Sequence, residues 1–328
     1  MSARLAGRLL WSLVGASALV PAARAHAQRA APERWIVVSD EPGDRLVMLD
    51  PQGRRAPAVI PIGARPRGMA LSPDGHRIFV ALGKDDAVAV ADVSSRHVVR
   101  RLKVGKDPEQ VAASPDGGTV YVSNEEIAMA TAVDVGTQRT RFTAPVGKEP
   151  EGVAVSPNGR KLYVTGESDS SVTVLDAANG RRLTAFAVGS RPRFVVFTRD
   201  GSRAFVSAEN GGTVTEVDAR ADSVVATIVI GDRTTKPTGM ALSPDEKTLY
   251  LANGRSNELA IIDLASRATT ATIPVGERPW GIALSRDGRR LYTANGRSGS
   301  VSVIDVKSRR VTSTLSVGGR PYTVLLLP

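Results

Sequence analysis

Residues 67–108 read RGMALSPDGHRIFVALGKDDAVAVADVSSRHVVRRLKVGKDP, and residues 280–321 read WGIALSRDGRRLYTANGRSGSVSVIDVKSRRVTSTLSVGGRP. The same frame also begins at Glu109, Glu151, Arg193 and Thr238. A proline ends each copy, at intervals of 42, 42, 42, 45, 42 and 42 residues: Pro66, Pro108, Pro150, Pro192, Pro237, Pro279 and Pro321. A fixed period of this length indicates one supersecondary unit that is repeated along the chain.

Each copy contains four short segments that are rich in Val, Ile, Leu and Thr, with turn residues between them. In the last full copy these segments are residues 281–285, 290–294, 300–305 and 311–317. A Ser-Pro-Asp-Gly turn follows the first segment at residues 72–75 and 114–117, where Gly accepts the positive φ of a tight turn. Four antiparallel strands at this period predict a β-propeller blade.

The number of blades follows from counting the copies. Six full copies occupy residues 67–321, while residues 33–66 supply three strands and residues 322–328 supply one. The sequence therefore predicts an all-β fold, a single seven-bladed β-propeller of four-stranded antiparallel blades spanning residues 33–328. The C-terminal strand is expected to join the N-terminal blade and close the ring, which removes exposed sheet edges.

The first 27 residues have the pattern of a secretory signal peptide. Arg4 and Arg8 precede an apolar run at residues 9–20, and Ala25-His-Ala27 has the form of a cleavage site. The run is too short to span a bilayer. We therefore expect cleavage near Ala27, a short linker at residues 28–32, and a periplasmic or secreted protein without a membrane span.

Composition excludes several kinds of chemistry. The chain has no cysteine, and its two histidines outside the predicted leader, His76 and His97, share no position in the repeat. We therefore expect no metal site, no cofactor and no catalytic residues of the usual nucleophile–base type. The net charge of +10 favours anionic partners, but without clustered bases and interleaved aromatic residues it does not indicate nucleic-acid binding.

Two sets of recurrent residues are interpreted as structural. The third strand of each copy ends in an aspartate that is expected to accept backbone N–H groups in the next turn: Asp50, Asp92, Asp134, Asp176, Asp218, Asp263 and Asp305. An aromatic residue at one strand position is expected to pack between blades: Phe79, Tyr121, Tyr163, Phe205, Tyr250 and Tyr292.

The residues on either side of the marker prolines differ most between copies and are expected to surround the channel mouth. Before the prolines stand Arg65, Asp107, Glu149, Arg191, Lys236, Arg278 and Arg320, and after them stand Arg67, Glu109, Glu151, Arg193, Thr238, Trp280 and Tyr322. Apart from Thr238, these residues form the predicted binding site. Two blades contribute acids and the other five a basic arc, so the site is either an anion site beside two aromatic rings or a salt-bridged connector.

The repeats resemble the YVTN-repeat β-propeller family. The resemblance rests on Tyr121-Val-Ser-Asn124, Tyr163-Val-Thr-Gly166 and Tyr292-Thr-Ala-Asn295, with VSVID at residues 301–305. It covers nearly all of the predicted mature chain and implies the fold, whereas members of the family have unlike roles.

A narrower resemblance is to exported propellers associated with pyrroloquinoline-quinone-dependent alcohol catabolism. It rests on Asp107-Pro-Glu109, on the motifs EPEG at 149–152 and RPRF at 191–194, and on GGTV at 211–214. Residues 166–170 and the insertion at 232–235 depart from that pattern. The resemblance implies a periplasmic accessory role, not that the chain binds the quinone.

Taken together, these features predict a non-enzymatic binding or scaffold protein, accessory to quinoprotein-linked alcohol catabolism or uptake. Its partner is expected to be an anionic small molecule or an acidic protein, and the protein to be a monomer. The alternative is a metal-assisted, lactonase-like hydrolase in which Asp107, Glu149 and Glu151, with Asn124 and Glu125, supply oxygen ligands and a general base.

Overall fold

A computed structural model describes Met1 and residues 35–327 of the chain. The predicted signal peptide, apart from Met1, and the predicted linker lie outside the described residues. Ala31–Pro328 forms one compact unit. The described part of this unit consists of strands and connecting turns, and it contains no helix that could cross a membrane.

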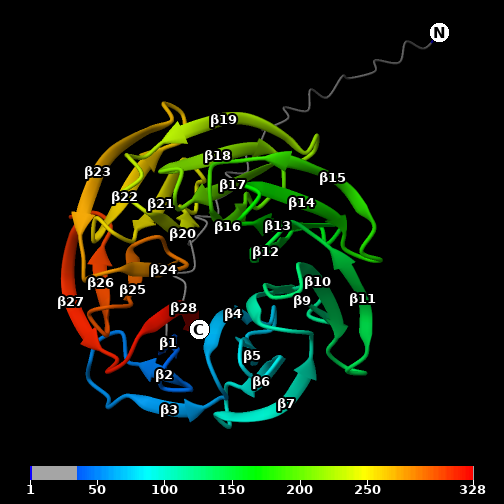
Figure 1. Ribbon diagram of the computed structural model, residues 1–328. Coiled ribbons are helices and arrows are strands. Elements are labelled where there is room, and N and C mark those ends of the chain that lie inside the picture. The colour runs from blue at the N-terminus through cyan, green and yellow to red at the C-terminus, as the bar shows by residue number, and fades with distance from the viewer. Residues whose placement is uncertain (2–34, 328) are drawn as a thin grey trace. The chain divides into compact units, whose positions relative to one another are not determined.

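The described strands form seven four-stranded antiparallel sheets that follow one another around a ring (Figure 1). This arrangement confirms the predicted all-β fold and the number of blades. Blade 1 contains β28 (Pro321–Leu327), β1 (Trp35–Asp40), β2 (Arg45–Leu49) and β3 (Ala58–Pro61). Blade 2 contains β4 (Pro66–Leu71), β5 (Arg77–Leu82), β6 (Ala87–Asp92) and β7 (His97–Lys103).

The other five blades repeat the order of blade 2. Blade 3 contains β8 (Pro108–Ala113), β9 (Thr119–Asn124), β10 (Met129–Asp134) and β11 (Thr140–Pro145). Blade 4 contains β12 (Pro150–Val155), β13 (Lys161–Gly166), β14 (Ser171–Asp176) and β15 (Arg182–Ala187). Blade 5 contains β16 (Pro192–Phe197), β17 (Arg203–Ala208), β18 (Thr213–Asp218) and β19 (Ser223–Val229). Blade 6 contains β20 (Pro237–Leu242), β21 (Thr248–Asn253), β22 (Glu258–Asp263) and β23 (Ala268–Pro274). Blade 7 contains β24 (Pro279–Leu284), β25 (Arg290–Asn295), β26 (Ser300–Asp305) and β27 (Arg310–Ser316).

The C-terminal strand closes the ring. β28 pairs antiparallel with β1, with Trp35 opposite Leu327 and Val38 opposite Val324. Because β28 is the innermost strand of blade 1, the last strand of the chain faces the channel beside the first strands of the other blades. Blade 1 therefore depends on hydrogen bonds between the two ends of the described chain.

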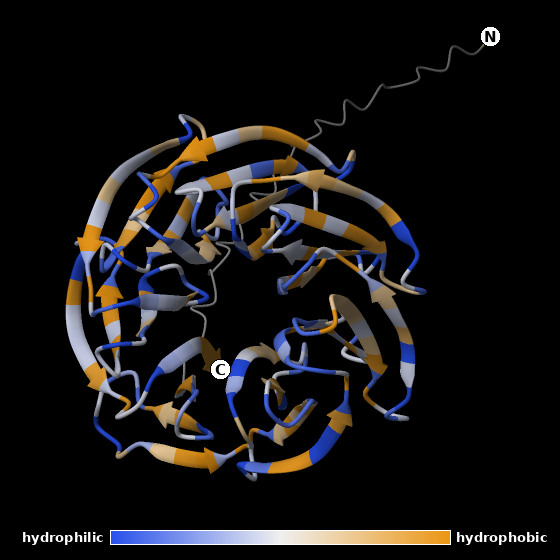
Figure 2. Ribbon diagram, viewed as in Figure 1, coloured by the Kyte–Doolittle hydropathy of each residue, from blue (hydrophilic) through white to orange (hydrophobic). Residues whose placement is uncertain are grey.

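The hydrophobic core lies between the blades. Apolar residues run along the strands and hydrophilic residues gather at the turns (Figure 2). Each buried cluster combines residues of two neighbouring blades; for example, Phe79 of blade 2 packs with Val111 and Val122 of blade 3. The six recurrent aromatic residues are all buried in such clusters, which confirms their predicted packing role.

The recurrent aspartates are also structural, as predicted. Each carboxylate accepts at least one backbone N–H of the turn between the third and fourth strands of its blade. At Asp92, for example, the carboxylate accepts the N–H groups of Ser94 and Ser95, and these hydrogen bonds lower its pKa to about 2. The seven acids therefore stabilise turns.

Candidate functional site

The residue after each marker proline lies on the innermost strand of its blade, and several of these side chains meet in the channel. The Arg67 guanidinium lies 4.2 Å above the Tyr322 ring, and the Trp280 and Tyr322 rings are 5.1 Å apart. The Tyr322 hydroxyl of blade 1 lies 3.5 Å from Glu151 Oε2 of blade 4. The first two contacts join neighbouring blades and the third joins blades 1 and 4, so we call these inner residues the channel floor.

Arg193 lies at the centre of this floor, where its side chain is only 5 % exposed. Its guanidinium contacts the carboxylates of Glu151 and Glu167, and its Nε is 2.7 Å from Glu209 Oε2. Burial by itself would disfavour the charge of Arg193, but the three carboxylates raise its pKa, so it remains a cation.

Two further arginines hold Glu109, which is fully buried. Arg65 Nη2 is 2.8 Å from Glu109 Oε1, and Arg67 Nη2 is 2.5 Å from Glu109 Oε2. Burial, followed by repulsion from Glu151, raises the pKa of Glu109 to about 10 despite these contacts. Although burial acts to raise it, the pKa of Glu151 is lowered because Arg193 and Arg67 stabilise its carboxylate. Neighbouring acids of the floor thus have pKa values shifted in opposite directions.

The residues before the prolines separate into paired and unpaired groups. Arg65 contacts Asp107, Arg191 Nε is 2.7 Å from Glu167 Oε2, and Arg278 Nη2 is 2.9 Å from Glu209 Oε1. By contrast, Glu149 is exposed and Lys236 bonds to Asn210, so neither joins the buried network. Most of the predicted basic arc is therefore salt-bridged, as in the connector interpretation.

Glu41, Glu167 and Glu209 were not among the residues of the predicted binding site. These three acids occupy one repeat position, directly after the second strand of a blade, and all three pair with arginines. In chain order this position holds Glu41, Gly83, Glu125, Glu167, Glu209, Gly254 and Gly296. The pattern of four glutamates and three glycines was available in the sequence.

The glycines at this position make room for arginines. A Cβ on Gly83 would lie 2.8 Å from both Arg65 Nη1 and Asp107 Oδ1, so a larger residue would require this ion pair to shift. A Cβ on Gly296 would meet only two backbone carbonyl oxygens, both at 3.4 Å. The space above Gly296 is therefore open, and it forms part of the cavity described next.

A cavity of about 490 Å³ opens above the floor. Its wall contains seven arginines and three glutamates, together with Trp280 and Tyr322, so its lining is strongly positive. Among the residues that the structure describes, no carboxylate lies within ion-pairing distance of Arg297 or Arg320. Glu125, on the same wall, likewise has no cationic partner among them. The cavity therefore offers two uncompensated cations and one uncompensated carboxylate.

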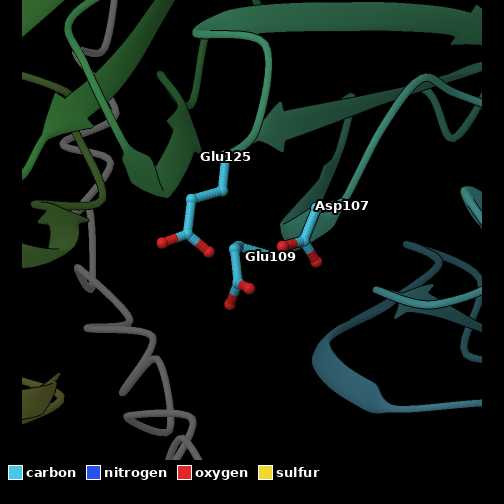
Figure 3. A group of neighbouring side chains, drawn as sticks. All are labelled: Asp107, Glu109 and Glu125. Atoms are coloured by element: carbon cyan, nitrogen blue, oxygen red, sulfur yellow. The ribbon is translucent and has the colours of Figure 1, made fainter.

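The side chains of Asp107, Glu109 and Glu125 lie close together (Figure 3), and Glu125 also lines this cavity. One oxygen from each carboxylate lies within 4.8 Å of the other two, a spacing that a cation could bridge. However, Arg65 already contacts Asp107 and Glu109, and Arg67 contacts Glu109. Guanidinium groups thus already contact two of the three acids, and their positive charge disfavours a metal ion between these carboxylates.

Comparison with known proteins finds a family match for part of the chain. Residues 181–321 match the model of a lactonase family, described as a seven-bladed β-propeller. No curated protein matches the chain. The matched stretch includes Arg193, Trp280, Arg297 and Arg320 of the cavity wall.

Similar solved structures share the fold. Hydrazine synthase of Kuenenia stuttgartiensis is 23% identical, with a TM-score of 0.75 over 88% of this chain and 99% of that chain. A candidate 6-phosphogluconolactonase of Bacteroides fragilis is 18% identical, with a TM-score of 0.79 over 92% and 99%. A similar candidate of Bacteroides uniformis is also 18% identical, with a TM-score of 0.75 over 90% and 100%. At these identities the structures show the fold alone.

The match of residues 181–321 to a lactonase family overturns the prediction of a non-enzymatic binding or scaffold protein. The prediction gave more weight to the lack of a cysteine and of a histidine near the channel than to the carboxylates that its alternative named as a general base. A free carboxylate can serve as a general base without either residue. The family match supports the reaction type of the alternative, which was a metal-assisted, lactonase-like hydrolase.

Proposed function

We propose that this protein hydrolyses a small lactone that carries an anionic group, in the cavity at the channel mouth. The proposal rests on one observation: the same cavity is lined by two arginines without an acidic partner, Arg297 and Arg320, and by one glutamate without a basic partner, Glu125. The match of residues 181–321 to a lactonase family supports the type of reaction.

The arrangement suits the opening of a lactone by water. Arg297 and Arg320 bind the anionic group and orient the ring, and the positive wall stabilises the charge that develops on the carbonyl oxygen. Glu125 accepts a proton from the attacking water while the water oxygen forms a bond to the carbonyl carbon of the lactone. The ring C–O bond then breaks, the leaving oxygen takes the proton from Glu125, and the product is a hydroxy acid with the Glu125 carboxylate restored. No step requires a metal ion.

Substitution of Glu125 tests this mechanism. In Glu125→Gln, kcat for a lactone bearing a carboxylate or phosphate is expected to fall by about 100-fold or more, because the base is lost while the shape of the cavity is kept. Glu126→Gln is the matched control, because Glu126 is the exposed neighbour outside the cavity wall. The measurement is proton release from a panel of lactones with and without an anionic group.

A chelator is expected to leave the rate of the wild-type protein unchanged. If the wild-type protein opens no lactone of the panel, the proposed function is wrong. If Glu125→Gln matches the wild type, Glu125 is not the base. Export to the periplasm, and the YVTN-repeat and quinone-linked affiliations, remain predictions from the sequence.

A further inference from the structure

A second cavity adjoins the first. It also measures about 490 Å³, and it shares Glu41, Arg65 and Arg320 with the first cavity. Its other side is formed by the turns of blades 1 and 2, including Asp44 and Lys84. Because three side chains belong to both walls, the two cavities meet at Arg320 and its neighbours.

Most charged side chains at this junction already form ion pairs or hydrogen bonds within the protein. Glu41 Oε1 lies 3.4 Å from Arg65 Nε and 3.1 Å from Arg67 Nη1, and Asp44 Oδ1 accepts the backbone N–H of Arg65. Lys84 and Arg320, in contrast, have no carboxylate within ion-pairing distance among the described residues. Together with Arg297 they provide unpaired cations from the rims of blades 7, 1 and 2.

We propose that the ligand of this site carries two anionic groups. This inference rests on the proposed lactone-binding role of the first cavity. The first group binds Arg297 and Arg320 in the first cavity, and the second binds Lys84 in the second cavity, with Arg320 between them. Each charged contact is made to a cation that has no internal partner, so binding breaks no existing ion pair. The substrate class is therefore a dianionic lactone, longer than a single ring.

Linear carboxylates test the proposal without requiring turnover. Monocarboxylates and α,ω-dicarboxylates of four to eight carbons are compared at constant ionic strength, with dissociation constants from thermal shift or calorimetry. The wild-type protein is expected to bind one dicarboxylate at least about tenfold more tightly than the monocarboxylate of equal length. Lys84→Ala is expected to remove most of this preference while leaving monocarboxylate binding unchanged.

Lys148→Ala is the matched control, because Lys148 is exposed at the connection into blade 4 and lines neither cavity. It removes the same charge and is expected to keep the preference. Three outcomes would overturn the inference. They are equal affinity for monocarboxylates and dicarboxylates, a dicarboxylate preference that persists in Lys84→Ala, and the absence of carboxylate binding. Lactone hydrolysis is measured separately, so turnover without a dicarboxylate preference contradicts this inference and leaves the proposed function standing.

Discussion

At the scale of single residues, the channel floor is governed by the cost of burying charge. Glu109, Glu151, Glu167 and Glu209 are almost fully buried, whereas only Arg67 and Arg193 among their partners are buried to a similar degree. An ionised carboxylate without a buried counterion is unfavourable. Burial therefore raises the pKa values of Glu109 and Glu167, whereas for Glu151 the contact with Arg193 outweighs burial and lowers the pKa, so neighbouring glutamates shift in opposite directions.

Glu167 gives this network a measurable pH dependence. It faces Arg191, Arg193 and Glu151, and burial raises its pKa from 4.5 to about 8. In the unfolded chain Glu167 loses its proton near its ordinary pKa, while the folded protein keeps that proton up to about pH 8. Its contribution to the free energy of unfolding is thus fully present below about pH 4.5 and is lost as the pH rises to about 8.

Glu167→Gln is therefore expected to flatten the fall in the thermal midpoint between pH 5 and pH 8 relative to the wild type. Glutamine cannot ionise, so the difference between the two curves isolates this carboxyl. Glu126→Gln, which changes an exposed acid, is expected to follow the wild-type curve. Parallel curves for the wild type and Glu167→Gln would show that Glu167 ionises normally in the folded protein.

At the scale of elements, the turn between the first and second strands of a blade depends on a residue with positive φ. Glycine supplies it at Gly75, Gly117, Gly159, Gly201 and Gly288, whereas blade 6 has Glu246 with φ 56°. An L-residue in this region costs roughly 1 kcal/mol, which glycine avoids. Blade 6 therefore contains a locally unfavourable turn.

Glu246→Gly is expected to raise the free energy of unfolding by up to about 1 kcal/mol, measured by chemical denaturation. The gain is reduced by loss of the exposed hydrogen bond from Arg199 N to the Glu246 carboxylate. Gly288→Ala is the reciprocal variant: its Cβ would lie 2.8 Å from Pro244 Cγ at φ 70°, so it is expected to destabilise. A destabilised Glu246→Gly would show that the side-chain contact outweighs the backbone effect.

At the scale of the whole molecule, ring closure by β28 keeps blade 1 complete. Without β28, β1 would present an unpaired edge, and Tyr322 would be missing from the channel floor. The outer strands of blades 2–7 have open edges but carry a register shift, a β-bulge that makes an edge less suitable for pairing with another chain.

Deletion of residues 321–328 is therefore expected to abolish the single cooperative unfolding transition and to cause aggregation, observed by calorimetry and size-exclusion chromatography. A circular permutant that joins β28 to β1 covalently and begins after β27 keeps every strand and is expected to unfold like the wild type. A truncated protein with an unchanged transition would mean that closure contributes little to stability.

The sequence by itself determined the ring, the number of blades, the closing strand and the repeat positions that reach the channel. It could do so because a blade is a local unit whose turns and alternating strands are encoded within about 42 residues. Only the tertiary structure decided which charged side chains form ion pairs within the protein. Arg65, Arg191 and Arg278 find acids on other strands, while Arg297, Arg320 and Glu125 do not. The position of a residue in the repeat specifies how high its side chain lies in the channel. Ion pairing depends in addition on whether charged atoms from residues distant in sequence come within contact distance.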